Sequence, residues 1–291
     1  MNIKLDEEIK KEKKLTILYI TILAICIIAI IATMIIEIIK DDESTIVENN
    51  NNDSSVEVPE IKEDKIDEYK EEFNNIFENK INYLKNNSYT ITKIREDDEI
   101  IILGYQNNES RINDYELDVN IPYINIKNKV TQEFNTQIRD TFQKKAEDIL
   151  KSNNNNIIYS VNYSAYISNN ILSLVVRSTL KEGDNAQRDI IQTYNYDLIN
   201  QKKCTIDTML ELKGITKKEV GEKIKQEIKI VQERVEELAK LGYSVSPRDY
   251  TSDLYSVNNI TEYFMGKDDV LYIIYAYGNQ NHTSEMDIVI M

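Results

Sequence analysis

Few side chains in this 291-residue chain could carry catalysis, and only one of them is a histidine, His282. A single imidazole excludes zinc sites built on several histidines and mechanisms that need two of them. His282 lies in a polar run that reads as a surface turn between two strands, where a histidine is usually exposed and inert. An enzyme would need a deep pocket that encloses His282 with Asp287 or Glu285, and we do not expect one.

The chain has two cysteines, Cys26 and Cys204. Cys26 lies inside a long apolar run, so it cannot reach Cys204 to form a disulfide, and the folded part must be held together by its core. Nothing beside Cys204 in the sequence could act as its base. We therefore expect Cys204 to be structural.

Three carboxylates, Asp114, Glu116 and Asp118, alternate along a predicted strand and share one face of it. Paired carboxylates can cleave glycosides when one of them has a raised pKa. The alternation with apolar residues is more typical of a strand with one solvated face. The chain also has no Trp that could form a platform for a glycan. We predict no catalytic residues, no metal site and no cofactor.

Residues 15–36 form an uncharged run of 22 residues. As a helix this run spans about 33 Å, enough for a hydrocarbon core of roughly 30 Å. Lysines precede it and Asp41-Asp42-Glu43 follows it, which favours a cytoplasmic N-terminus. A cleaved signal peptide is the alternative, but it would be shorter and would carry an Ala-x-Ala site.

The sequence therefore predicts a single-pass protein of the cell membrane with its C-terminal part outside the cell. We divide it into a cytoplasmic stub (1–14), a transmembrane helix (15–39), an acidic Asn-rich linker (40–65) and an extracytoplasmic domain (66–291), with sub-parts 66–152 and 153–291. The net charge is −15 for the whole chain and −9 for residues 66–291. This acid excess argues against nucleic-acid binding and favours a cationic partner.

The hydrophobic pattern of residues 66–291 predicts an α+β fold. Helical spacing covers 66–84, 130–150 and a long helix opened by the capping box of Thr216 and Glu219 and closed by Gly242. Strand patterns cover 89–94, 99–105 and 115–121, an antiparallel meander over 159–196, a hairpin over 260–277 and a last strand at 285–290. We expect two long helices packed on one face of a mostly antiparallel sheet.

Tyrosine is abundant, with 19 Tyr against 5 Phe. Tyrosine offers rigid contact area with a polar tip, which suits binding surfaces, and loops on a rigid scaffold often carry recognition. We place the contact surface in the turn 278–283 and the irregular segment 243–259. The candidate ligand-binding residues are Gly278, Asn279, Gln280, Asn281, His282, Tyr250 and Tyr255.

Several segments resemble a known bacterial extracytoplasmic domain family. These segments are 116–124 (ELDVNIPYI), 135–139 (NTQIR), 168–176 (SNNILSLVV), 194–198 (YNYDL) and 204–210 (CTIDTML). The family includes the lysozyme-sensing outer domain of the sigma-V anti-sigma factor (RsiV-like) and domains attached to peptidoglycan deacetylases.

The resemblance implies an outer domain that binds a basic protein such as lysozyme or a wall component, and a stub that binds a sigma factor. An acidic domain would attract a basic ligand by electrostatic steering. The alternative is a cell-wall-modifying accessory domain or a structural partner of another membrane protein, without catalysis of its own.

Overall fold

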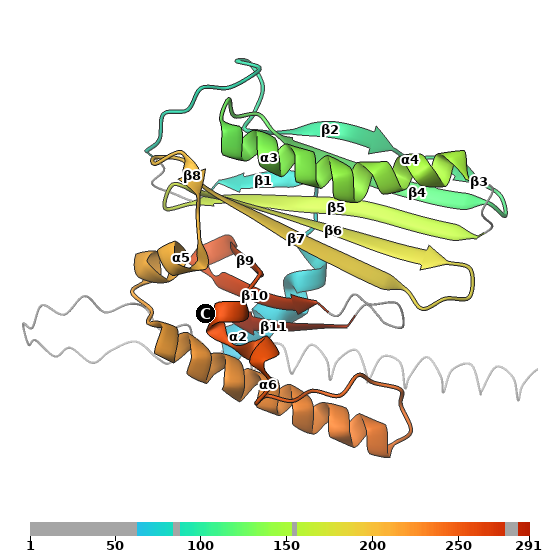
Figure 1. Cartoon of the computed structure of the whole chain (residues 1–291), viewed down its shortest axis with the longest axis vertical. Coiled ribbons are helices and arrows are strands. Elements are labelled where there is room, and N and C mark those ends of the chain that lie inside the picture. Colours follow the sequence, from blue (N-terminus) through green and yellow to red (C-terminus); the bar gives the residue numbers. More distant parts are fainter. Residues whose placement is uncertain (1–62, 84–87, 153–155, 277–284) are drawn as a thin grey trace, which may run out of the picture. The chain divides into compact units, whose positions relative to one another are not determined.

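The computed structural model describes residues 63–83, 88–152, 156–276 and 285–291, and two β-sheets form its centre (Figure 1). The large sheet has the strand order β2-β4-β5-β6-β7-β8, with β1 paired to β5 and β3 to β4. The small sheet has the order β11-β10-β9. The strands are β1 (Lys80–Tyr83), β2 (Ile101–Asn107), β3 (Ser110–Arg111), β4 (Tyr115–Ile124), β5 (Ile157–Ser168), β6 (Ile171–Glu182), β7 (Arg188–Asp197), β8 (Lys202–Lys203), β9 (Glu262–Met265), β10 (Leu271–Ala276) and β11 (Met286–Ile290).

Helices cover the outer faces of both sheets (Figure 1). The large sheet is covered by one long helical stretch, and the small sheet by α5 and α6, with α2 beside β11. The helices are α2 (Glu63–Glu72) with a 3-10 turn (Phe73–Asn75), α3 (Lys129–Ile138), a π-helical segment (Arg139–Gln143), α4 (Lys144–Lys151), α5 (Ile206–Lys213), α6 (Lys217–Lys240), and short 3-10 turns at Asp253–Tyr255, Val257–Asn259 and Lys267–Asp269.

Three apolar clusters hold these layers together. The first lies between the large sheet and α3–α4 and includes Phe134 and Phe142. The second lies between the small sheet and α6 and includes Ile224 and Ile228. The third lies where the two sheets face each other and contains Phe73, which follows α2. Burial of apolar area in each cluster supplies the main force that stacks the layers.

The predicted α+β class with a mostly antiparallel sheet is confirmed, whereas the expected placement of the helices on one face of one sheet is wrong. There are two stacked sheets because the hairpin β9–β10 and β11 form a separate sheet that buries one face against β5–β7. Two pairings in the large sheet are parallel, β4 with β5 and β1 with β5. The segment α3–α4 is the crossover that a parallel pair such as β4–β5 requires.

Many local predictions are confirmed. The meander β5–β6–β7 pairs in antiparallel register throughout. The capping box of Thr216 and Glu219 is present, and Gly242 has the left-handed conformation at φ +88° that closes α6. The hairpin β9–β10 and the last strand β11 are also where the sequence pattern placed them.

Other local predictions are wrong. The helix expected to reach residue 84 ends at Asn75, because Asn79 adopts a positive φ of 56° and its side chain bonds to Asn162 and to the N–H of Tyr163 on β5. The strand expected at 89–94 is reduced to one isolated bridge between Lys93 and Ile126. The helix α5 was not expected.

The sequence expectations for 1–14, 15–39 and most of the linker 40–65 lie outside the described residues. Among the residues that the structure describes, no helix combines the length and the apolar character needed to span a membrane.

Side chains of the large sheet cover the outer edge of β9. Thr193 accepts from the N–H of Tyr263 at 3.1 Å, Asn195 donates to the carbonyl of Tyr263 at 2.7 Å, and Ser173 accepts from the N–H of Met265 at 3.1 Å. These bonds satisfy backbone groups that an edge strand would otherwise leave unpaired. The edge of β9 is therefore closed to further strand pairing.

Glu262 also lies at this edge of β9, and we expect its carboxylate to make the stability of the fold depend on pH. Its carboxylate accepts from the N–H and hydroxyl of Thr193, at 2.7 and 3.0 Å. Burial nevertheless raises the pKa of Glu262 above its ordinary value. An acid whose pKa is raised in the folded state loses stabilising free energy as the pH rises through that pKa.

We therefore expect Glu262→Gln to be more stable than the wild type at pH 8, and this advantage to shrink as the pH falls toward 4. Urea unfolding of both proteins across this range measures the difference. Glu116→Gln is the matched control, because Glu116 is exposed on β4. A gain that is equal at all pH values would contradict the role of the Glu262 charge.

Candidate binding site

A groove of about 730 Å³ runs between α2, α6 and β11. The wall from α2 includes Ile66, Asp67 and Lys70, and the floor includes Met286 and Ile288 of β11. The wall from α6 is lined by Lys223, Gln226, Glu227, Ile230, Val231 and Arg234. The groove therefore combines apolar side chains with charges of both signs.

An ion-pair bridge joins the two helical walls. Lys70 of α2 lies 2.5 Å from Glu227 of α6, and Lys223 lies 2.8 Å from the same carboxylate. Burial acts to raise the pKa of Glu227, but the hydrogen bonds from Lys223 and Lys70 outweigh burial and hold the pKa below its usual value. Glu227 is therefore a charged link that fixes α2 against α6.

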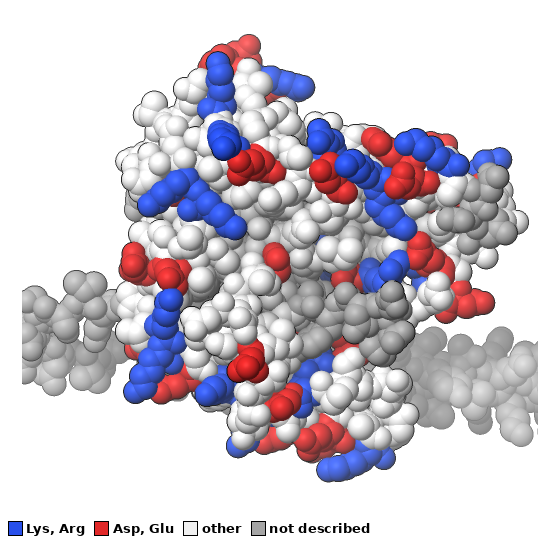
Figure 2. Space-filling view, viewed as in Figure 1, with Lys and Arg blue, Asp and Glu red and all other residues white. Residues whose placement is uncertain are grey.

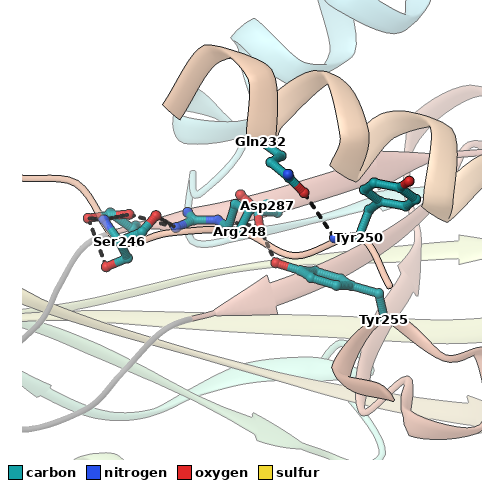
Figure 3. Close-up of polar contacts among 7 residues, drawn as sticks. Gln232, Ser246, Arg248, Tyr250, Tyr255 and Asp287 are labelled. Atoms are coloured by element: carbon teal, nitrogen blue, oxygen red, sulfur yellow. Dashed lines mark hydrogen bonds and ion pairs between the residues drawn. The ribbon is translucent and has the colours of Figure 1, made fainter. Parts of the chain in front are cut away.

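A second polar network ties the irregular segment after α6 to β11 (Figure 3). The Arg248 guanidinium donates from Nε to Asp287 at 2.8 Å and from Nη1 to Glu285 at 3.0 Å. Tyr255 donates its hydroxyl to Asp287 at 3.0 Å, and Ser246 donates to Glu285. The side chains of Arg248 and Asp287 are each only 3% exposed, so this is a buried ion pair.

The predicted contact residues Tyr250 and Tyr255 lie near this network. Tyr255 is 3% exposed, and its ring packs edge-on against Tyr275 with centroids 5.0 Å apart. Tyr250 is half-buried, and its N–H donates to Gln232 of α6 at 3.3 Å (Figure 3). Both residues line a second groove, of about 430 Å³, between α6 and residues 250–257.

The other predicted contact residues, Gly278, Asn279, Gln280, Asn281 and His282, lie outside the described residues. An enzyme built on His282 would need Asp287 or Glu285, and both acids are bonded to Arg248. Two of the three carboxylates of the β4 region follow the predicted alternation, since Glu116 and Asp118 are exposed and Leu117 between them is buried. Asp114 lies before β4 and faces Arg111 at 3.3 Å.

No cluster of three or more His, Cys, Asp or Glu side chains with metal-binding geometry occurs within the described part of the chain. Cys204 is fully buried there, next to α5. Burial raises the pKa of the Cys204 thiol to about 12, which strongly disfavours the reactive thiolate. The position of Cys204 therefore fits a structural role.

We expect Cys204 to react with a thiol reagent such as DTNB at least about a hundredfold more slowly in the folded protein than in urea, because both burial and the raised pKa suppress attack. The measurement uses a Cys26→Ser background so that one thiol is counted. An exposed cysteine introduced as Asn108→Cys, in a chain without the two native thiols, is the control for reagent access. Equal rates in folded and unfolded protein would contradict the burial of Cys204.

The sequence reasoning missed Arg248 and the walls of the large groove. One signal was present: Arg248 is the only arginine after Arg234, and it stands in a segment followed by many acids. A lone arginine in such a segment indicates a specific carboxylate partner, since an unpaired buried guanidinium is costly. The sequence alone did not indicate which acid that partner would be.

The fold and the groove define an α+β protein with two stacked sheets and a cleft beside a strand edge. Comparison with known proteins does not define the protein more narrowly. No family model and no curated protein matches the sequence. Two solved structures with a similar chain trace are DUF3298 family proteins, from a family of domains of unknown function.

One of these structures is a DUF3298 family protein from Pseudomonas aeruginosa, with 8% identity and a TM-score of 0.37 over 70% of this chain and 90% of that chain. Another is a DUF3298 member from Bacteroides fragilis, with 13% identity and a TM-score of 0.27 over 55% of this chain and 74% of that one. Values this low say nothing about function.

Proposed function

We propose that this chain is a single-pass membrane protein whose folded part lies outside the cell and binds a protein ligand there. The observation that supports ligand binding is the groove of about 730 Å³ along β11. Its isoleucines, Met286 and two arginines offer apolar contact area and hydrogen-bond donors of the kind that protein interfaces use. The function is therefore recognition, carried by a rigid scaffold.

A basic extracellular protein such as lysozyme, or a wall component, is the first candidate ligand. Residues 66–291 carry a net charge of −9, which attracts a basic protein from a distance. Acidic and basic side chains are interspersed over the face seen in Figure 2. The attraction would thus come from the net charge rather than from a uniform acidic patch on that face.

Binding of hen lysozyme to the full-length protein in detergent tests this proposal. Biolayer interferometry at about 20 mM and about 150 mM salt should show binding that weakens as salt increases, because screening shortens the range of the attraction. Cytochrome c is the control for non-specific attraction of a basic protein. Absence of lysozyme binding at both salt concentrations would remove lysozyme as the ligand.

In an anti-sigma-type sensor, the cytoplasmic stub 1–14 would hold a sigma factor and release it when the outer domain binds its ligand. A two-hybrid assay of residues 1–14 against the sigma factors of the source organism tests this part separately. A stub that binds none of them would leave an extracellular binding protein without the sensor role.

A further inference from the structure

Strand β11 forms an outer edge of the small sheet, because among the described strands it pairs with β10 alone. Leu271 and Met291 exchange two backbone hydrogen bonds, at 3.0 and 2.9 Å. In an antiparallel pair such residues alternate with residues whose N–H and C=O point away from the partner. The register of β10 and β11 therefore turns the backbone groups of Met286, Ile288 and Ile290 outward.

These outward groups are unpaired within the described residues. No hydrogen bond from that part of the chain reaches the N–H or C=O of Met286 or Ile288. The edge of β9, at the other side of the same sheet, is covered by Thr193, Asn195 and Ser173, as described above. One edge of the small sheet is thus closed by side chains, and the other opens into the large groove.

The two walls of the groove flank this edge on opposite faces of the sheet. The side chains of Met286 and Ile288 pack against the cluster that contains Ile66 of α2, whereas Val289 belongs to the cluster that contains Ile224 and Ile228 of α6. A strand added beside β11 would alternate in the same way, with one set of side chains toward α2 and the other toward α6.

Each wall carries one charge that has no ion-pair partner among the described residues. On α2 this residue is Asp67, and on α6 it is Arg234; both are exposed. Apolar side chains stand beside them, Ile66 on α2 and Ile230 and Val231 on α6. A strand with a basic residue toward α2 and an acidic residue toward α6 would complement both charges.

We propose that β11 binds an extended polypeptide segment as an added strand. The segment alternates apolar side chains with one basic residue directed at Asp67 and one acidic residue directed at Arg234. Backbone hydrogen bonds to Met286 and Ile288 supply affinity and the groove walls supply selectivity, as in other cases of strand addition. This inference rests on the proposed function in that the ligand is a polypeptide.

Selection of phage-displayed random twelve-residue peptides on the full-length protein tests the inference. Enriched peptides should lose at least about tenfold in affinity for Ile288→Pro, because proline removes the outward N–H and its ring obstructs the incoming strand. The ladder to β10 does not use this N–H, so an edge proline is tolerated. Ile288→Ala is the matched control: it removes most of the side chain, as proline does, but keeps the N–H, so the affinity for Ile288→Pro should be at least about tenfold lower than for Ile288→Ala.

Circular dichroism and urea unfolding of both variants verify that the fold is retained. If Ile288→Pro does not fold, peptides methylated on alternate backbone nitrogens replace it, and one of the two methylation patterns should abolish binding to the wild type. No enriched peptide, or peptides indifferent both to Ile288→Pro and to methylation, would overturn strand addition. Lysozyme binding by the same variants separates the two proposals: lysozyme bound equally by all, with no peptide bound, leaves the proposed function and removes this one.

Discussion

Arg248→Ala is expected to lower the free energy of unfolding by about 3–5 kcal/mol, which is the range for removing one partner of a buried ion pair. Arg248 and Asp287 side chains are each 3% exposed and lie 2.8 Å apart. Without the guanidinium, the Asp287 carboxylate keeps the hydroxyl of Tyr255 but loses the cation that compensates its charge at a position where its side chain is 3% exposed. A second carboxylate, Glu285, loses its cation as well.

Urea unfolding of the full-length protein, followed by far-UV circular dichroism, measures this loss. Arg248 and Arg234 both line the groove of about 730 Å³, but Arg234 is exposed. Arg234→Ala is therefore a matched control and should change stability by no more than about 0.5 kcal/mol. Arg248→Met combined with Asp287→Leu should recover much of the loss, since a buried pair can often be replaced by apolar residues. A loss below about 1 kcal/mol for Arg248→Ala would contradict the role of Arg248 as the cation that compensates Asp287.

The partner of Arg248 and the walls of the groove could not be predicted from the sequence. Asp287 lies 39 residues away, and the described part of the intervening chain includes the strands β9 and β10. The groove walls come from α2, the middle of α6 and β11, which no local pattern connects. Tyr255 was expected to face a ligand because it lies in an irregular segment, but this segment packs against the small sheet and buries the ring.

The fold was more predictable wherever the pattern was local. The alternation along β5 and β6 and the capping box of α6 depend on neighbouring residues, and both are confirmed. Strand β1 depends on a distant partner, because Asn79 is held by Asn162 and Tyr163 more than 80 residues away. The helical spacing over 66–84 therefore predicted a helix through the residues that form β1. The order strand, helix, strand around α3–α4 did contain the signal for a parallel pair, but the expectation of a mostly antiparallel sheet assigned no partner to the strand at 115–121.

Phe73 anchors the α2 wall of the groove, and we expect its replacement to lower stability strongly. Phe73 is fully buried between the sheets, and its ring lies 5.7 Å from Phe77, 6.0 Å from Tyr272 and 6.4 Å from Phe264, measured between centroids. Phe264 and Tyr272 are themselves stacked at 4.5 Å. Phe73 thus ties the end of α2 to the small sheet.

Phe73→Ala should cost about 3–5 kcal/mol, because it removes a buried ring and leaves a cavity that rigid strands cannot collapse around. The loss should appear both in urea unfolding and as faster hydrogen exchange in α2, which then remains attached chiefly by Ile66, Tyr69 and the bridge from Lys70 to Glu227. Ile112→Ala is the control, since Ile112 is 90% exposed and should change neither measurement. Hydrogen exchange that rises in α2 while the rest of the domain stays protected would show that α2 opens locally. Peptide binding at β11 should then slow hydrogen exchange of α2 in the wild type. If α2 exchanges no faster in Phe73→Ala than in the wild type, the ring does not anchor the wall.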